Sequence, residues 1–464
     1  MKLKCFLIMS FILVLYSPSV FSYNDTTTHK DITKTSIDKF EEINDYFKSI
    51  LGFKEGSNEP VNETTITKLI QEGSTNEDHR NRAYNHFYNP LNGEGLDDYP
   101  FPLFRLYGGK SSNCGSLYKY TGIPALGWAL GSGYRSCGAG YFDEDNYNGY
   151  SWIKARESYY NSFFYPELRD YYLISFFEQF GRVLHMLEDM SVPAHVRNDM
   201  LGHLTPKGLN YIKDHWDVLK ELSIVDFVKH NASNNYENWV EINKKQSDII
   251  AYKDSTEHPL VIPKFATPQQ YWDNDVYNSS NPNPEDTLAT DSEKGAGLSE
   301  YTNANFVSTK TIFSNNNPES EKKRFPYPRT SSMDREYPAF ISRIQAEDGK
   351  YDNIPLLNKV RDGEIVDKGF IGVKYLAYPL KSEAIHSERV YFFNPAVHSN
   401  YADILIPKTI AYTAGLIDYF FRGRMGIVPK FSGYDAESQM FKKVTVAATN
   451  DSKWIDDRIE PMPY

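Results

Sequence analysis

FGRVLHMLEDMSVPAHVRND, residues 180–199, is the stretch that decides the fold, because it joins a helix end to side chains of metal-binding types. His185 and Asp189 are four residues apart, so on a helix they project from one face about one turn apart. Pro193 does not continue a helix comfortably, so the chain turns there and can bring His195 back toward the same point. Two imidazoles and a carboxylate that converge in this way are ligands that zinc accepts. The alternative for the His–Asp pair alone is a solvated pair or a helix C-terminal cap.

The chain around this motif favours a mostly α-helical fold. Apolar residues recur at helical spacing in several segments, which predicts amphipathic helices. The main predicted helices cover about 31–50, 151–164, 167–188 and 400–423. The last of them carries Lys408 and Asp418 within its apolar stretch, so we interpret it as a core helix and not as a membrane span.

The bulk composition bounds the possible partners. The chain has 464 residues, which is enough for a large core with insertions. Its formal net charge of -11 argues against a broad basic surface for duplex nucleic acid. A polyanionic substrate is still compatible with this charge if metal ions hold it, because a bound cation supplies its own local positive charge.

The amino terminus has the pattern of a secretory signal peptide. Lys2 and Lys4 precede a short apolar run, and Val20 and Ser22 are small residues placed for a cut before Tyr23. We therefore expect residues 1–22 to be removed and the mature protein to be secreted or periplasmic. The alternative is an uncleaved membrane anchor, although the apolar run is shorter than the roughly 20 residues that a spanning helix needs.

Three motifs occur in order along the chain: THKDIT at 28–33, NHFYNPLNG at 85–93 and HMLEDMSVPAH at 185–195. Together they resemble the secreted bacterial zinc-dependent phospholipases C, whose superfamily also includes the single-strand-specific zinc nucleases of fungi and plants. The HFYNP sequence is closer to the phospholipase form, HFYDP, than to the nuclease form. The resemblance covers about 23–240, and the helix near 400–424 is expected to join the same bundle.

The resemblance implies an α-helical bundle that encloses a cleft with two or three zinc ions. Asp189 would be able to bridge two ions, and His195 would begin the third site. The family also uses its mature N-terminal residue, a tryptophan, as a ligand, and the predicted cut places Tyr23 there. The ligands carried over in this way are Tyr23, His29, Asp78, His86, His185, Asp189 and His195.

The last two ligands of the family are a His and a Glu one helical turn apart, and no such pair follows His195. We predict His203 and Glu237 for these positions, with an insertion between them. Asp199 and His215 are alternatives for these two positions. A further alternative is that the third zinc has fewer protein ligands or is absent. Glu178 lies two turns before His185, where it would either orient that ligand or form an ordinary salt bridge.

The sequence predicts five regions. Between residues 241 and 369 the polar, turn-rich composition shows no helical or strand period, which predicts a long loop-rich insertion outside the bundle. The expected regions are the signal peptide at 1–22, a zinc-binding helical catalytic domain at 23–240, the insertion at 241–369, the C-terminal part of the bundle at 370–424 and a tail at 425–464.

The function implied by the resemblance is that of a secreted zinc-dependent phosphodiesterase, in which a metal-bound hydroxide attacks phosphorus. Asp78 is the candidate catalytic residue that orients or deprotonates the water. A phospholipid head group is the expected substrate, with possible contact to a membrane surface. The alternatives are single-stranded nucleic acid as substrate, or a catalytically inactive binding protein that zinc stabilises.

Overall fold

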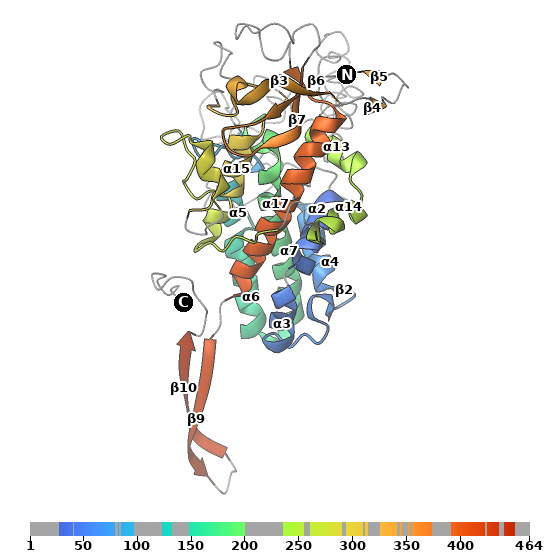
Figure 1. Ribbon diagram of the computed structural model, residues 1–464. Coiled ribbons are helices and arrows are strands. Elements are labelled where there is room, and N and C mark those ends of the chain that lie inside the picture. Colours follow the sequence, from blue (N-terminus) through green and yellow to red (C-terminus); the bar gives the residue numbers. More distant parts are fainter. Residues whose placement is uncertain are drawn as a thin grey trace, which may run out of the picture.

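The computed structural model describes most of the chain, including all the segments that carry the motifs (Figure 1). The described residues are 27–39, 41–78, 82, 85–96, 123–131, 148–199, 235–254, 260–289, 294–309, 311–313, 325–340, 344–345, 351–352, 355–373, 391–422, 425–435 and 440–450. The expected signal peptide, Tyr23 and His203 lie outside these residues, as does His215.

The fold is mostly helical, as the sequence predicted. The long helices are α2 (Thr28–Lys39), α3 (Glu41–Ser49), α4 (Ile66–Asn76), α6 (Trp152–Phe164), α7 (Arg169–Glu188) and α17 (Pro395–Phe421). Shorter helices are α5 (Ala125–Leu130), α8 (Pro193–Val196), α13 (Tyr236–Asn243), α14 (Gln246–Ala251) and α15 (Leu298–Asn305). Single 3₁₀ turns are η1 (Gly56–Asn58), η4 (Pro166–Leu168), η5 (Asp189–Ser191), η6 (Tyr252–Asp254), η7 (Pro268–Tyr271), η8 (Pro284–Leu288) and η11 (Thr330–Ser332).

Helix α7 is the centre of the bundle, and α4, α6 and α17 pack against it. Its face toward the core carries Phe176, Phe177 and Phe180, each of which is fully buried. Burial of aromatic side chains on this scale stabilises the helix far more than its intrinsic propensity does. The result is a rigid support for the residues at the end of α7.

Helices α4 and α7 cross at very close range, and two glycines make this possible. A Cβ atom on Gly181 would lie 2.0 Å from the carbonyl oxygen of Ile70, and one on Gly73 would lie 2.1 Å from that of Glu178. The two backbones therefore touch where any side chain would hold them apart. This contact brings the end of α4 next to the last turns of α7.

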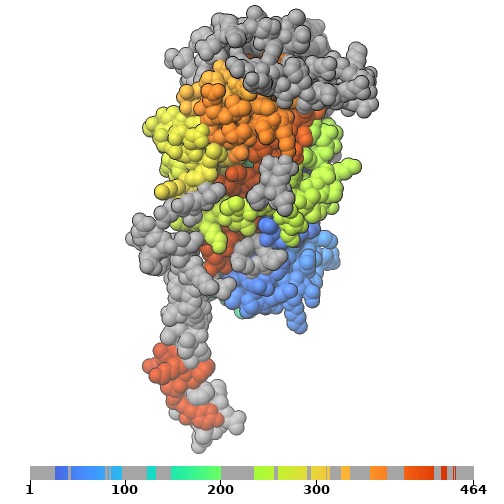
Figure 2. Space-filling model, in the orientation of Figure 1, coloured from blue at the N-terminus to red at the C-terminus, as the bar shows by residue number. Residues whose placement is uncertain are grey.

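The residues from 241 to 369 are not a set of loops outside the core, and our expectation for them was wrong. They contribute α14, α15 and most of an antiparallel sheet with the strand order β3-β6-β7-β8. Figure 2 shows the yellow and orange residues of this segment packed around α17. The strands are β3 (Met333–Phe340), β6 (Pro355–Lys359), β7 (Val366–Val373) and β8 (Tyr391–Phe392), with a separate pair of β4 (Ile344–Gln345) and β5 (Tyr351–Asp352).

A second hydrophobic core explains this difference. Buried residues of α15 and the sheet, such as Tyr301, Leu356 and Phe370, pack against Tyr401 and Leu405 from the first half of α17. The second half of α17 belongs to the core of the bundle. The segment supplies one side of this core and α17 supplies the other.

The region after α17 also has regular structure. Strands β9 (Met425–Asp435) and β10 (Met440–Asn450) pair in antiparallel register and form a hairpin that projects from the end of the bundle (Figure 1). A small hairpin of β1 (Pro60–Val61) and β2 (Thr64–Thr65) precedes α4. Among the described helices, none combines the length and the apolar character needed to cross a membrane.

Candidate metal centre

Seven predicted ligands converge from five helices and two connecting segments. His29 lies in the first turn of α2. The sequence had placed it just before this helix. Asp78 follows α4 by two residues, and His185 lies in the last turn of α7. Asp189 begins η5, and the proline turn after it leads into α8, which carries His195. His86 lies in the loop of the second motif and Glu237 in the first turn of α13.

Three overlapping groups of ligand atoms form at this point. They are His29 with Asp78 and His185, His86 with His185 and Asp189, and Asp189 with His195 and Glu237. Within each group the ligand atoms all lie within 4.8 Å of one another. All seven side chains are buried, with exposed fractions of 0% or 1%. These groups could hold metal ions, and Asp189 and His185 each belong to two of them.

The distances between the ligand atoms match those around a small cation. His29 Nε2 lies 3.4 Å from Asp189 Oδ1, and His185 Nε2 lies 3.4 Å from Asp78 Oδ1 and 3.3 Å from Asp189 Oδ2. Two ligands of one tetrahedral zinc ion with bonds of about 2.0–2.1 Å are about 3.4 Å apart. Asp189 Oδ1 faces His29 whereas Oδ2 faces His185, which is the arrangement that a bridging carboxylate requires.

Several polar atoms at the centre lack ordinary hydrogen-bond partners among the described residues. Both carboxylate oxygens of Asp78 and Asp189, and both ring nitrogens of His86 and His185, are buried without one. His86 Nδ1 lies 2.8 Å from Asp189 Oδ2, but the geometry is not that of a hydrogen bond. Buried polar groups are costly when they are unsatisfied. A cation between these atoms would satisfy them, so the residues fit a metal centre.

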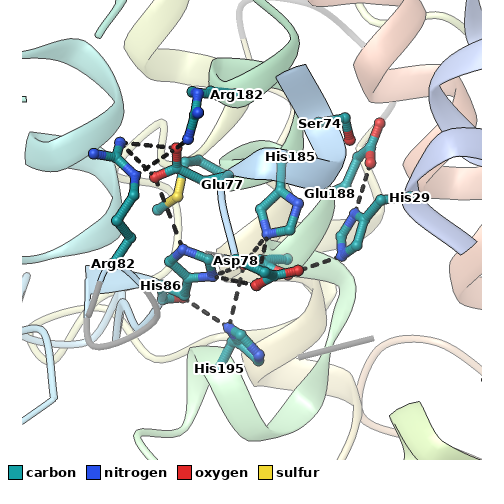
Figure 3. Close-up of polar contacts among 12 residues, drawn as sticks. His29, Ser74, Glu77, Asp78, Arg82, His86, Arg182, His185, Glu188 and His195 are labelled. Atoms are coloured by element: carbon teal, nitrogen blue, oxygen red, sulfur yellow. Dashed lines mark hydrogen bonds and ion pairs between the residues drawn. The ribbon is translucent and has the colours of Figure 1, made fainter. Parts of the chain in front are cut away.

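Two of the histidines are oriented by partners on their other ring nitrogen (Figure 3). His29 Nδ1 lies 2.7 Å from Glu188 Oε2, which turns Nε2 toward Asp189. His195 Nδ1 lies 2.8 Å from the carbonyl oxygen of His86, which leaves Nε2 3.2 Å from Glu237 Oε1. Metal-binding histidines commonly donate their second N–H to a carboxylate or a carbonyl in this way.

The HFYNP motif contacts the short helix α8, which carries His195. The backbone N–H of Tyr88 donates to the carbonyl oxygen of His195 at 3.1 Å. The ring of Phe87 stacks on the His195 ring, with centroids 4.8 Å apart and planes at 5°. The Tyr88 hydroxyl also donates to Asp273, which ties the motif to the 241–369 segment. The motif therefore supplies a ligand and fixes the orientation of another.

Glu77, next to Asp78, is a buried carboxylate that two arginines neutralise. Arg82 donates to both of its oxygens at 2.9 and 3.0 Å, and the indole N–H of Trp128 donates at 2.8 Å. Burial by itself raises the pKa of Glu77, but Arg82 and Arg182 outweigh that effect and hold it below its ordinary value. The arginines thus keep an ionised carboxylate inside the bundle beside the centre.

The carboxylates of the centre raise the basicity of its histidines. Burial lowers the pKa of His185, but Asp78 and Asp189 raise it well above the ordinary value of 6.5. Burial also lowers the pKa of His195, but Asp189 and Glu237 raise it to about 9. Without a cation, protons on these rings balance the buried negative charge. Protons and metal ions therefore compete for the same nitrogens.

The structure brings together His29, Asp78, His86, His185, Asp189, His195 and Glu237. Asp199 is buried but belongs to none of the three groups. Glu178 pairs with Arg182 at 3.1 Å, which is the salt bridge that the sequence left open as one of two alternatives. Sequence reasoning missed Glu188, Glu77 and Phe87. The two glutamates each precede a ligand aspartate, and that repeated Glu–Asp pair was the available signal.

Comparison with family models, curated proteins and solved structures finds no match for this chain. The fold and the site show a mostly helical protein with a buried cluster of His, Asp and Glu side chains that could hold metal ions.

Proposed function

We propose that this protein is an exported zinc-dependent phosphodiesterase. The observation that carries the proposal is the position of Asp189, whose two buried oxygens face different histidines and have no hydrogen-bond partner among the described residues. A carboxylate in this position balances the charge of two cations. Imidazole and carboxylate are ligands that suit zinc, and clustered divalent ions are a common means of cleaving phosphate esters.

Zinc bound here would supply Lewis-acid polarisation of a phosphoryl oxygen and of water. The chain's own residues would do the rest. Asp78 Oδ1 lies 3.5 Å from His86 Nδ1 and 3.4 Å from His185 Nε2, at the centre of the cluster. From that position its carboxylate would bind metal and accept a proton from the attacking water. Phe87 and Glu188 would keep the histidines in place.

A phospholipid head group is the substrate that we propose, because the HFYNP motif resembles the phospholipase form. Single-stranded nucleic acid is the alternative within the same chemistry. An inactive zinc-stabilised binding protein is the alternative from another class. The burial of all seven ligand side chains favours this last alternative, because a substrate must reach the metals for catalysis.

The test is a metal analysis of the purified exported protein beside assays on phosphatidylcholine and single-stranded DNA, with and without a chelator. We expect two or three zinc ions per chain and chelator-sensitive hydrolysis of phosphatidylcholine. Cleavage of DNA alone would indicate the nuclease, and zinc without turnover on either substrate would indicate the binding protein. A protein without zinc would refute the proposal.

A pair of histidine variants makes this test specific. His86→Ala removes a proposed ligand, so we expect it to lose zinc and activity. His398→Ala is the matched control, because His398 is a buried histidine on α17 that stacks on Phe393 and belongs to none of the three groups. Equal zinc content in the two variants would contradict the proposed site.

A further inference from the structure

Each of the two central aspartates is preceded by a buried glutamate. The pairs are Glu77–Asp78, after the end of α4, and Glu188–Asp189, at the end of α7. Successive residues of a helical turn point in different directions. The aspartate of each pair can therefore face the centre while its glutamate faces the surrounding bundle, and all four side chains are fully buried.

Glu188 is engaged on both of its oxygens by residues of α2. Its Oε2 lies 2.7 Å from His29 Nδ1, and its Oε1 accepts a hydrogen bond of 2.7 Å from the hydroxyl of Thr33. Thr33 lies one helical turn after His29, so a single carboxylate spans two turns of α2. The Thr33 hydroxyl also lies 3.3 Å from the hydroxyl of Ser74 on α4.

These contacts determine which nitrogen of His29 carries the proton. An ionised carboxylate only accepts hydrogen bonds, so the N–H of His29 must be at Nδ1. The lone pair is then at Nε2, which lies 3.4 Å from Asp189 Oδ1, on the side of the centre. Thr33 has one hydroxyl proton and directs it at Glu188, which holds the carboxylate in the plane that His29 needs.

Glu77 does not do the same for His86. Its nearest oxygen lies 3.9 Å from His86 Nε2, which is too far for a hydrogen bond. Both of its oxygens are bound by Arg82, and Trp128 adds a third donor. The two Glu–Asp pairs therefore have different roles, and only one of them orients a ligand.

We propose that Glu188, held by Thr33, is the positioning residue of the metal centre: it fixes the Nδ1–H form of His29 so that Nε2 binds the metal. The proposal rests on the proposed metal binding, because it assigns a role within that same site. Glu188 acts through His29 and does not itself contact the reacting atoms. The carboxylate also increases the electron density of the His29 ring, so Nε2 becomes a more basic ligand for the metal.

The experiment compares zinc affinity among variants of the full mature chain, measured by competition with a chelating dye. Glu188→Leu removes the hydrogen-bond acceptor of His29. We therefore expect a loss of about 10–100-fold in the affinity for the zinc ion that His29 would bind. Glu188→Gln is the conservative variant, because its amide can accept from His29 and donate to Thr33, and we expect it to restore most of that affinity. Thr33→Val should give an intermediate loss.

The matched control is Glu178→Gln, a carboxylate on the same helix that pairs with Arg182. We expect it to bind zinc like the wild type. Cobalt substitution supplies a readout that a merely structural role would not move: the visible absorption of the Co²⁺ protein should change in Glu188→Leu and stay unchanged in Glu178→Gln.

Three outcomes decide the matter. Wild-type affinity and an unchanged cobalt spectrum in a folded Glu188→Leu protein would overturn the proposal. If that variant does not fold by circular dichroism, unchanged affinity in Thr33→Val would overturn it instead, because the Thr33 hydroxyl acts on the centre through its hydrogen bond to Glu188. Failure of the proposed function itself would be seen in the wild type, as an absence of zinc, and not in the variants.

Discussion

At the scale of the residue, the main property of the centre is its buried negative charge. Asp78, Asp189 and Glu237 bring three buried carboxylates close together, and burial of unpaired charge is expensive. Positive charge can reduce this cost in two ways. The histidines can carry protons, or cations can bind to the histidines and the carboxylates together. The balance between these two states leads to three predictions.

The first concerns Asp189. Asp189→Asn preserves the shape of the side chain but removes the charge that offsets two cations, so we expect loss of at least one zinc ion and of nearly all activity. Metal analysis and a hydrolysis assay measure both effects. Asp403→Asn is the control, because Asp403 lies on α17 and pairs with Lys244. Full zinc content and normal turnover in Asp189→Asn would rule out the bridging role.

The second concerns pH. Zinc must displace the protons that the raised pKa of His185 and of His195, the latter about 9, keep on those rings at neutral pH. Zinc affinity should therefore increase with pH up to about 9, and binding at pH 7 should release protons. Calorimetry in buffers of different ionisation enthalpy measures that release. A binding enthalpy that is independent of the buffer would contradict it.

The same pKa shifts should make the metal-free protein less stable as pH rises, whereas its zinc affinity increases. A histidine whose pKa is raised by folding stabilises the folded state fully below its ordinary value of 6.5, and this contribution is lost as pH rises through the folded value of about 9. We expect the metal-free protein to become less stable between pH 6.5 and 9. Denaturant unfolding at several pH values, with chelator present, measures this trend, and rising stability over that range would contradict it.

At the scale of the element, the site depends on how closely α4 and α7 approach each other. Glycine is needed at this crossing for space and not for an unusual backbone conformation, since neither Gly73 nor Gly181 has a positive φ. The crossing places Asp78, just after α4, beside His185 on α7, with Nε2 of His185 3.4 Å from Asp78 Oδ1. A change in the helix spacing would therefore act on the ligands directly.

Gly181→Ala tests this dependence. Its Cβ would lie 2.0 Å from a backbone oxygen, so the helices must separate, and overpacking of this kind costs about 1–3 kcal/mol or more. We expect lower stability in urea and a lower zinc content. Gly149→Ala is the control, because nothing lies within 4 Å of a Cβ there. Equal stability and zinc content in the two variants would show that the crossing is more tolerant than the structure indicates.

At the scale of the whole molecule, the two cores support the site from opposite sides. Helix α15 packs against η5 and α8, the elements that carry Asp189 and His195. The indole N–H of Trp272 donates to the carbonyl oxygen of Met186 at 3.1 Å, just beyond His185 on α7. The segment 241–369, which its composition predicted to lie outside the bundle, therefore forms one wall of the centre.

Trp272→Ala should show this coupling. Trp272 is fully buried, and removal of a buried aromatic side chain costs about 3–5 kcal/mol. We expect a lower midpoint in urea and weaker zinc binding, although no proposed ligand is changed. Tyr160→Ala is the control, since the Tyr160 side chain is 61% exposed on α6. Unchanged zinc affinity in a folded Trp272→Ala protein would mean that the second core is independent of the site.

The sequence by itself determined the features that depend on near neighbours along the chain. The four-residue spacing of His185 and Asp189 places them on one helix face, and Pro193 turns the chain so that His195 returns. Apolar residues at helical spacing predicted the positions of α7 and α17, because these residues are the ones that each helix buries in the cores. These relations span only a few residues, so local geometry is sufficient to find them.

Only the tertiary structure decided the relations between distant segments. Glu188 orients His29 across 159 positions of the chain, and Glu237 reaches His195 across 42. The sheet and α15 form a core only because α17, which follows them in the chain, supplies its other half. Local composition cannot reveal such a core, because the free energy of burial depends on which surfaces meet and not on where they lie in the sequence.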